Sequence, residues 1–191
     1  MTAPRVARSS APIETERLRL RPYSPADLVA LIDGAEQFQQ RVGFPIADGV
    51  REFLVSGEVS PVWLEKLRQS APGAPNPWAY GYGVVDRASN TVIGTAGFKG
   101  PPDANGVVEI AYGIAPSHEG RGYATEVAAA LVTFAFGHDN VRTVRAHTLP
   151  NPNASTRVLT KCGFALLGEV EDPDDGRVWR WELPREVSPP A

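Results

Sequence analysis

The stretch His118-Glu119-Gly120-Arg121-Gly122-Tyr123-Ala124 is a glycine-rich turn that runs directly into a helical pattern. Glycine permits a positive φ angle and leaves no side chain between the backbone and a ligand. Successive N–H groups in such a turn point outward together, and the dipole of the following helix adds about half a positive charge. We expect the Arg121 guanidinium to pair with phosphate oxygens as well. The turn therefore predicts a site for a phosphate or diphosphate.

Two common phosphate-binding motifs do not fit this turn. The dinucleotide-binding pattern Gly-x-Gly-x-x-Gly fails because Thr125 stands where the third glycine belongs. The Gly-Lys-Ser/Thr ending of a phosphate loop is absent from the sequence. A plain turn before a helix is the structural alternative to an anion site. The residues on either side of the turn distinguish the two interpretations.

The residues around the turn alternate between strand and helix patterns. Ahead of it, β-branched and aromatic residues predict three strands in an antiparallel meander, at 78–85, 91–98 and 107–114. Behind it we expect a helix at 122–136, a strand at 141–149, a short helix at 154–162 and a closing hairpin at 164–169 and 178–183. This order indicates an α+β fold with a mixed, mostly antiparallel central sheet flanked by helices.

The N-terminal third adds a strand and an irregular segment. Residues 17–22 alternate basic and apolar side chains, as in a half-exposed strand. Ser24 is an N-cap candidate for a helix in which Pro25 takes the first position. Residues 40–77 carry only helical patches, at 50–55 and 61–67, because glycines and prolines interrupt them.

Length and composition limit the classes of protein to consider. The chain has 191 residues, which favours one domain, with 42% hydrophobic and 21% charged residues, as is usual for globular proteins. A formal net charge of −3 argues against a nucleic-acid partner. No apolar run approaches the roughly 20 residues of a membrane-spanning helix, so we expect no membrane partner. We expect disordered tails at 1–13 and 185–191 around one domain at 14–184.

Cysteine and histidine usage indicates the compartment and the metal content. The sequence has one cysteine, Cys162, and three histidines, too few for a disulfide framework or a recognisable zinc spacing. Residues 1–10 lack the apolar block of a secretory signal. We therefore expect a cytoplasmic protein with no metal.

Two ordered blocks resemble the acetyl-CoA signature of the GNAT superfamily, and most of all its ribosomal-protein N-terminal acetyltransferase branch. The first block is Glu109-Ile110-Ala111-Tyr112-Gly113-Ile114-Ala115-Pro116 followed by Glu119-Gly120-Arg121-Gly122-Tyr123-Ala124-Thr125-Glu126. The second is Asn151-Pro152-Asn153-Ala154-Ser155-Thr156-Arg157-Val158-Leu159-Thr160-Lys161-Cys162-Gly163-Phe164. The segment 16–21 is similar to the first strand of that branch. The resemblance spans roughly residues 14–184.

The resemblance implies a single-domain GNAT-like fold that uses acetyl-CoA as co-substrate. It implies that the strand ending at Ile114 splays from its neighbour and pairs with the pantetheine amides, and that Asn153 or Asn151 reaches the same arm. The cofactor-binding residues implied are Ile114, Glu119, Gly120, Arg121, Gly122, Tyr123, Ala124 and Asn153. The family loop often has Gln or Arg where this chain has Glu119, so only the amide of Glu119 is expected to face the diphosphate.

The reaction implied is direct acetyl transfer, in which an uncharged amine attacks the thioester carbonyl and a thiolate leaves. Glu109 is the candidate base, because it shares a strand face with Ala111 and Gly113; a solvent-exposed strand glutamate is the alternative. Ser155, implied to lie near the sulfur, is the candidate proton donor to the thiolate, although a helix-capping serine is also consistent. Many family members place a tyrosine acid where this chain has Leu159, which leaves Tyr112 and Tyr123 as fallback acids.

The function that these residues favour is an acetyl-CoA-dependent N-acetyltransferase. The expected acceptor is a primary amine. Both a protein N-terminus and a small molecule stay open as its source, because the fold does not determine the acceptor. The alternative is a non-catalytic acyl-CoA-binding regulatory module. Both a monomer and a homodimer are compatible with the sequence.

Overall fold

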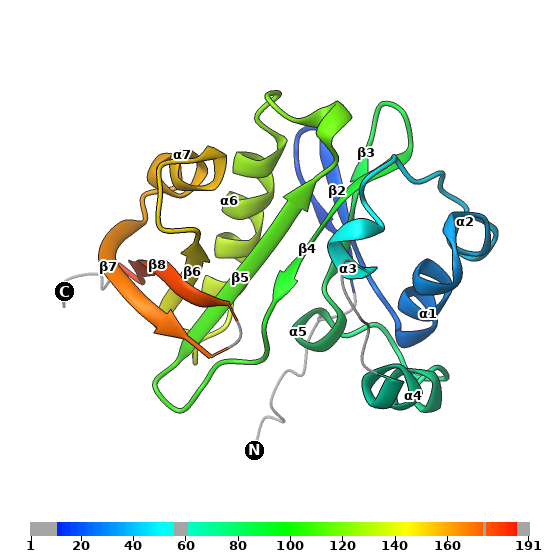
Figure 1. The fold of residues 1–191 in the computed structure, drawn as a ribbon, viewed down its shortest axis with the longest axis horizontal. Coiled ribbons are helices and arrows are strands. Elements are labelled where there is room, and N and C mark those ends of the chain that lie inside the picture. Colours follow the sequence, from blue (N-terminus) through cyan, green and yellow to red (C-terminus); the bar gives the residue numbers. More distant parts are fainter. Residues whose placement is uncertain (1–10, 56–60, 174, 187–191) are drawn as a thin grey trace, which may run out of the picture.

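The computed structural model describes residues 11–55, 61–173 and 175–186 (Figure 1). Its centre is a sheet of eight strands in the order β1-β2-β3-β4-β5-β6-β8-β7. The strands are β1 (Ile13–Glu14), β2 (Leu18–Pro22), β3 (Tyr82–Asp86), β4 (Thr91–Phe98), β5 (Val107–Ile114), β6 (Thr143–Thr148), β7 (Ala165–Asp172) and β8 (Gly176–Pro184). Neighbouring strands are antiparallel except β5 and β6, which are parallel. The mixed α+β sheet and the antiparallel meander are therefore confirmed.

Helices cover both faces of the sheet (Figure 1). They are α1 (Pro25–Asp33), α2 (Ala35–Val42), α3 (Glu52–Val55), α4 (Pro61–Gln69), α5 (Pro77–Tyr80), α6 (Tyr123–Phe136) and α7 (Ala154–Lys161), with a 3-10 turn at Pro116–His118. In the described ranges, no helix combines the length and the apolar character needed to cross a membrane.

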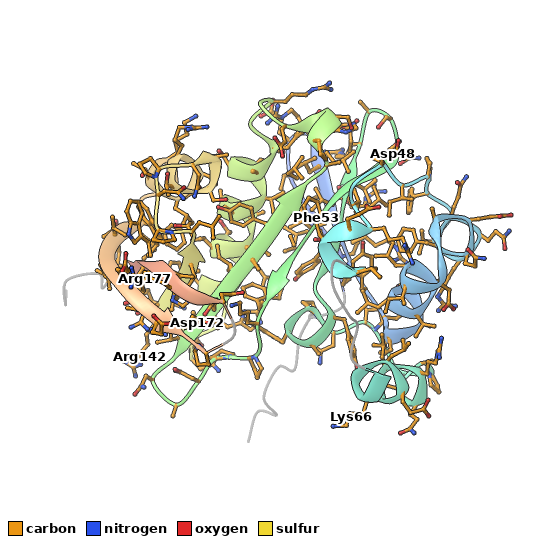
Figure 2. The ribbon with its side chains drawn as sticks, in the orientation of Figure 1. Asp48, Phe53, Lys66, Arg142, Asp172 and Arg177 are labelled. Carbon is orange, nitrogen blue, oxygen red and sulfur yellow. The ribbon has the colours of Figure 1, made fainter. Side chains whose placement is uncertain are left out.

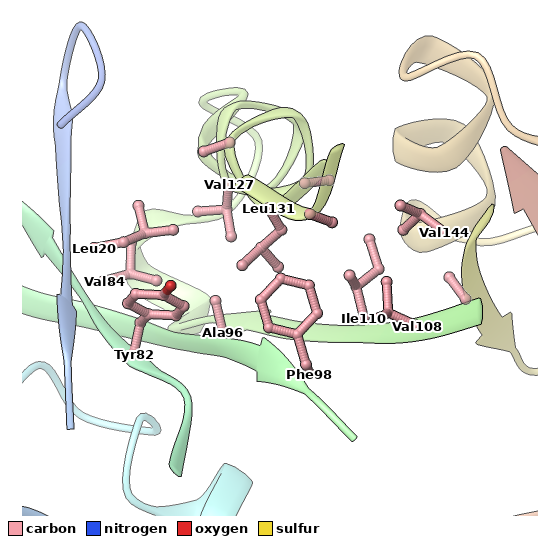
Figure 3. Close-up of a cluster of buried hydrophobic side chains, with 14 of the residues drawn as sticks. Leu20, Tyr82, Val84, Ala96, Phe98, Val108, Ile110, Val127, Leu131 and Val144 are labelled. Carbon is pink, nitrogen blue, oxygen red and sulfur yellow. The ribbon is translucent and has the colours of Figure 1, made fainter. Parts of the chain in front are cut away.

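The main core lies between α6 and one face of the sheet (Figure 3). Val127, Leu131 and Ala135 recur every four residues on α6 and are fully buried, so they form the apolar stripe with which this helix packs on the sheet. They pack on alternate residues of the strands, among them Leu20, Tyr82, Val84, Ala96, Phe98, Val108 and Ile110. Deleting one such side chain, as in Leu131→Ala, typically costs 2–5 kcal/mol.

A second core lies on the opposite face, where α1, α2 and α4 pack. It contains Tyr23, Leu28, Leu31, Phe38 and Leu67. The start of α1 agrees with the sequence, since the Ser24 side chain accepts a hydrogen bond from the Asp27 amide and Pro25 occupies the first turn. Helix α2 was not predicted, because Phe38 is its one buried residue and the others give no apolar stripe.

The strand predicted at 78–85 begins too early. The Asn76 side chain accepts a hydrogen bond from the Trp78 amide and starts the short helix α5, which ends at Gly81 with φ +66°. The Trp78 ring then packs on Phe98 and Phe134, with centroids 4.4 and 5.5 Å apart. An aromatic residue that looked like part of a strand thus enters the core from a helical turn.

The expected tails fall mostly outside the described residues, which exclude 1–10 and 187–191. Ile13 pairs with Leu20 as part of β1. The Arg185 amide donates to the Arg142 carbonyl at 2.7 Å. The ordered chain therefore includes residue 13 at one end and residue 185 at the other.

Candidate active site

Strands β5 and β6 diverge in the middle of the sheet. They pair only from Val107 to Glu109, opposite 143–145. On its other edge β5 remains paired with β4 as far as Ile114. The β6-facing edge of residues 110–114 therefore has no strand partner in the described chain, which confirms the expected splay and leaves backbone groups free for a ligand.

The glycine-rich turn lies at the end of this free edge. Gly120 and Gly122 have φ angles of +73° and +80°, the left-handed region that glycine adopts at little cost. Gly122 caps α6 with no side-chain hydrogen bond, so the first-turn amides of the 14-residue helix lack intrahelical acceptors. The backbone N–H groups of 120–122 donate to no other backbone carbonyl in the described chain. This arrangement has the donors and the dipole that an anion requires.

A groove of about 620 Å³ joins the turn to β5 and α7. Six of the eight residues expected to bind the cofactor line it, namely Ile114, Glu119, Gly120, Gly122, Tyr123 and Ala124. Arg157 and Lys161 also line it, one turn apart on α7, and neither forms an ion pair within the described residues. The sequence reasoning did not single out these two cations, although their i, i+4 spacing without an acidic partner was a usable signal.

Two of the eight expected side chains are turned elsewhere. The Arg121 guanidinium donates to the Ser117 carbonyl at 3.1 Å and does not line the groove. Asn153 caps α7: its side chain accepts from the Thr156 amide and donates to the Asn151 carbonyl, both at 3.0 Å. In this conformation, the groove derives its positive character from backbone amides and α7 rather than from Arg121.

Arg17, at the start of β2, holds the turn from outside. Its Nη1 donates to the Arg121 carbonyl and its Nε to Glu126 Oε2, both at 2.8 Å, while the guanidinium lies 4.7 Å from the centre of the Tyr123 ring. Burial raises the pKa of the Glu126 carboxyl, but hydrogen bonds from Thr15 and Arg17 outweigh burial and leave that pKa below its ordinary value. Arg17 lies more than a hundred residues from the turn, so no sequence spacing revealed this contact.

A second cavity, of about 150 Å³, lies within the splay and is lined from both faces of the sheet. Ser155 and Leu159 line it from the α7 side, and Lys99, Glu109 and His147 from the other. Glu109 Oε1 lies 2.9 Å from Lys99 Nζ and 3.1 Å from His147 Nδ1. Glu109 is thus the centre of a polar cluster rather than a solvent-exposed strand residue. The described residues hold no His, Cys, Asp or Glu group arranged to bind a metal.

Lys99 bridges two carboxylates of this cluster. Its Nζ also lies 3.0 Å from Asp175 Oδ2, at the tip of the β7–β8 hairpin. Burial lowers the pKa of Lys99, but its hydrogen bonds to Glu109 and Asp175 outweigh burial and raise that pKa above the ordinary lysine value. Figure 2 shows Asp172 on the same hairpin, which brings a further carboxylate within 3.7 Å of His147 Nδ1.

Ser155 lines both the groove and the cavity in the splay. It occupies the second position of α7, behind the capping residue Asn153, so the helix-cap interpretation of Ser155 is wrong. No other described residue makes a hydrogen bond with its hydroxyl. Tyr112 also lines both spaces; its hydroxyl is buried without a partner in the described chain, and burial raises its pKa well above the ordinary value. Leu159, where a family tyrosine acid is common, is buried in the core.

A third cavity, of about 370 Å³, lies on the face opposite α6. Small residues form its floor: Thr95, Gly97, Ala111 and Gly113. Apolar and aromatic side chains from the helices and neighbouring loops cover it, including Tyr23, Leu28, Ile32, Phe53 and Tyr80. Figure 2 shows Phe53 between α3 and β5, where its ring lies 3.1 Å from the position that a Cβ would take at Gly113. Phe53, Tyr112 and Gly113 line both this cavity and the groove, so the two spaces meet at β5.

Comparison with known proteins gives a family match over most of the chain. The Acetyltransferase (GNAT) domain model matches residues 17–165. Among curated relatives, the chain is similar to the uncharacterized N-acetyltransferase YjdG of Bacillus subtilis, with 32% identity over 83 residues, 44% of this chain. The chain spans 49%, 51% and 63% of the lengths of three curated Bacillus N-acetyltransferases to which it is similar.

Solved structures show the same fold at low sequence identity. The ribosomal-protein-S5-alanine acetyltransferase of Vibrio fischeri superimposes with a TM-score of 0.64 and 17% identity, over 91% of this chain and 96% of the other. The aminoglycoside acetyltransferase AAC(6')-Ib, solved in complex with coenzyme A, gives a TM-score of 0.58 and 20% identity, over 88% and 95%. At these identities the likeness concerns the fold alone.

Proposed function

The chain belongs to the GNAT acetyltransferase family, and on this premise we propose that it transfers an acetyl group from acetyl-CoA to a primary amine. The acceptor is the amine of a protein N-terminus or of a small molecule. One observation carries the proposal. The glycine turn opens into a groove that meets, at the splay of β5 and β6, both the cluster around Glu109 and the cavity on the opposite face.

The groove fits the shape and the charge of coenzyme A. The free amides at 120–122 and the N-terminus of α6 match a diphosphate, and Arg157 and Lys161 add positive charge along α7. The unpaired edge of residues 110–114 offers backbone groups to the pantetheine amides. The Arg121 and Asn153 side chains can join these contacts only by leaving their present hydrogen bonds, and Asn151 is the alternative to Asn153 for the pantetheine arm.

The cavity opposite α6 is the proposed acceptor site. It reaches β5 at Ala111 and Gly113 and meets the groove where Phe53, Tyr112 and Gly113 line both spaces. Acetyl-CoA, when bound, supplies an activated thioester. The residues of the chain then position an amine, take up its proton at the Glu109 cluster, and donate a hydrogen bond from Ser155 toward the departing sulfur.

Two measurements on the whole protein test the proposal. Coenzyme A is expected to raise the melting temperature by linkage, and acetyl-CoA is expected to release free thiol in the presence of an accepted amine. A suitable panel contains an alanine-initiated peptide, 2-phenylethylamine, spermidine and kanamycin, with each compound run against a blank without amine. If millimolar coenzyme A gives no stabilisation, the groove assignment is wrong. Stabilisation without thiol release from any amine instead supports the acyl-CoA-binding module.

A further inference from the structure

His147 lies on β6 beside Glu109, and its side chain is 7% exposed. Its Nδ1 atom lies 3.1 Å from Glu109 Oε1 and 3.7 Å from Asp172 Oδ2. An ionised carboxylate can only accept a hydrogen bond, so Nδ1 must carry the hydrogen in this contact. In the neutral ring, the lone pair is then on Nε2, the form of imidazole that accepts a proton.

The Nε2 atom is buried and has no hydrogen-bond partner in the described chain. The ring lines the cavity in the splay, which Ser155 lines from the other side of the sheet. A buried polar atom without a partner costs free energy, and an exception of this kind calls for an explanation such as a catalytic role. The geometry is that of a base whose ring lines the cavity, whose Nε2 has no other partner in the described chain, and whose Nδ1 is fixed by a carboxylate.

One carboxylate oxygen of Glu109 already has two donors. Its Oε1 atom lies within hydrogen-bond distance of both Lys99 Nζ and His147 Nδ1. The Lys99 ammonium also contacts Asp175. The arrangement suits a carboxylate that accepts hydrogen bonds from Lys99 and His147 and so orients both side chains.

We propose that Nε2 of His147 is the atom that takes the proton from the acceptor ammonium, and that Glu109 is a positioning residue which fixes the imidazole tautomer. The assignment rests on the acetyl transfer proposed above and deepens it. It replaces Glu109 with His147 as the base.

Charged groups surround His147 on every element that packs against it. Lys99 follows β4, Glu109 is on β5, and Arg180 is its direct partner on β8. The remaining charged groups on this face are Asp172 and Asp175 of the β7–β8 hairpin and the Arg145–Glu182 ion pair. Two carboxylates, Glu109 and Asp172, lie near Nδ1, and Lys99 and Arg180 add positive charge around the ring, so its surroundings carry charges of both signs.

The proton balance of the reaction is complete with these residues. His147 removes one proton from the ammonium, and the resulting amine forms a C–N bond with the thioester carbonyl carbon. The C–S bond then breaks with its electron pair on sulfur, and the second amine proton neutralises the thiolate by way of Ser155. His147 finally returns its proton to the solvent, so one amide, one thiol and one proton are formed.

The first test needs no acceptor. In ¹⁵N spectra of the whole protein above pH 8, His147 is expected to show a protonated Nδ1 and an unprotonated Nε2, with the signals assigned by their loss in His147→Asn. In Glu109→Ala the imidazole is expected to change toward the Nε2–H tautomer, which predominates in free histidine. A wild-type protein whose His147 carries its hydrogen on Nε2 contradicts the assignment.

The second test uses thiol release with the most active amine of the panel. His147→Asn keeps an N–H donor near Glu109 but lacks Nε2, so kcat/KM is expected to fall about 100-fold at neutral pH and to lose the histidine limb of its pH profile. In Glu109→Gln, kcat/KM is expected to fall less, about 10-fold, and its pH profile is expected to keep the histidine limb. Coenzyme A stabilisation is expected to be unchanged in both variants.

His138→Asn is the matched control. That histidine lies at the end of α6, with Nδ1 2.9 Å from the Phe134 carbonyl, and its replacement is expected to preserve the limb. If the wild-type protein is active and His147→Asn keeps its full kcat/KM and its pH profile, the assignment of His147 is wrong while the proposed activity stands. The same follows if Glu109→Gln loses more kcat/KM than His147→Asn. If the wild-type protein releases no thiol with any amine of the panel, the proposed activity is contradicted. The tautomer measurement then still tests whether Glu109 positions His147.

Discussion

The coenzyme groove and the cluster around Glu109 are built in opposite ways. The anion-binding end of the groove consists of backbone amides from one continuous segment, residues 119–124, in which two glycines hold positive φ angles. The cluster consists of side chains from residues 99, 109, 147, 172 and 175, on β4–β7 and their loops. A site made of backbone requires glycine at defined positions and is visible in the sequence. A site made of distant side chains has no such local mark.

The two regions differ in how they tolerate substitution. In the glycine turn, the side chains of Glu119 and Arg121 are exposed, so we expect that they can change without moving the amides. In the cluster, the side chains form hydrogen bonds and ion pairs with one another, so the loss of one leaves a partly buried charge or donor without its partner. We therefore expect substitutions in the groove to be damaging mainly at its glycines, and substitutions in the cluster to be damaging at any of its residues.

Gly122→Val should produce the largest effect. A Cβ at this position would lie 3.5 Å from Arg17 Nη2, an ordinary contact, so the damage arises from the φ angle of +80°, which a β-branched residue does not tolerate. The turn must open and lose two or more charge-assisted hydrogen bonds, so calorimetry should show coenzyme A binding at least about 100-fold weaker. Gly122→Asn is the control, because asparagine accepts the left-handed region. Normal binding by a folded Val variant would show that the turn is structural only.

Ser155→Ala tests the point where groove and cluster meet. The hydroxyl lines both spaces and has no protein partner among the described residues, so its removal should leave the fold and coenzyme A affinity unchanged. We expect kcat for the best amine to fall about 50-fold, close to the lower end of proton-transfer effects, because water can enter the vacated space. An unchanged kcat excludes Ser155 as the proton donor and directs attention to Tyr112.

Arg17→Ala tests whether a remote side chain supports the backbone-built site. The substitution removes the hydrogen bond to the Arg121 carbonyl and the contact with the Tyr123 ring. Coenzyme A affinity, measured by calorimetry, should fall about 10-fold, the equivalent of one hydrogen bond from a charged group. Arg17→Lys, which keeps the charge but lacks the fork geometry, should recover only part of that loss. Equal affinity in all three proteins would show that the loop holds its shape without β2.

Glu126→Gln should have the smallest effect and a defined pH dependence. The pKa of Glu126 is below its ordinary value in the folded protein, so its stabilisation is present above the pKa of the unfolded chain and disappears as the pH falls through the folded value. Urea unfolding at pH 7 should show a cost of about 1 kcal/mol for the variant. The difference should shrink toward zero below about pH 4. A difference that is constant with pH would mean that the carboxylate charge contributes nothing.

The sequence predicted most of the second half of the fold. The strands at β4 and β5 and the helix α6 follow from local patterns: β-branched residues, turn residues and an apolar stripe every four positions. Prediction failed where the local pattern was weak or ambiguous. Helix α2 buries a single side chain, and Trp78 has a strand-like residue type but occupies a helical turn that Asn76 and Gly81 define.

The sequence by itself determined the glycine turn, the strand before it and the helix after it, because each depends on contacts between residues close together in the chain. It also placed Glu109 and Ser155 on segments that meet at the splay. Only the tertiary structure brought Arg17 to the Arg121 carbonyl, and Lys99 and His147 to Glu109. These contacts depend on strand register and on where β5 leaves β6, which side-chain packing across the whole sheet decides.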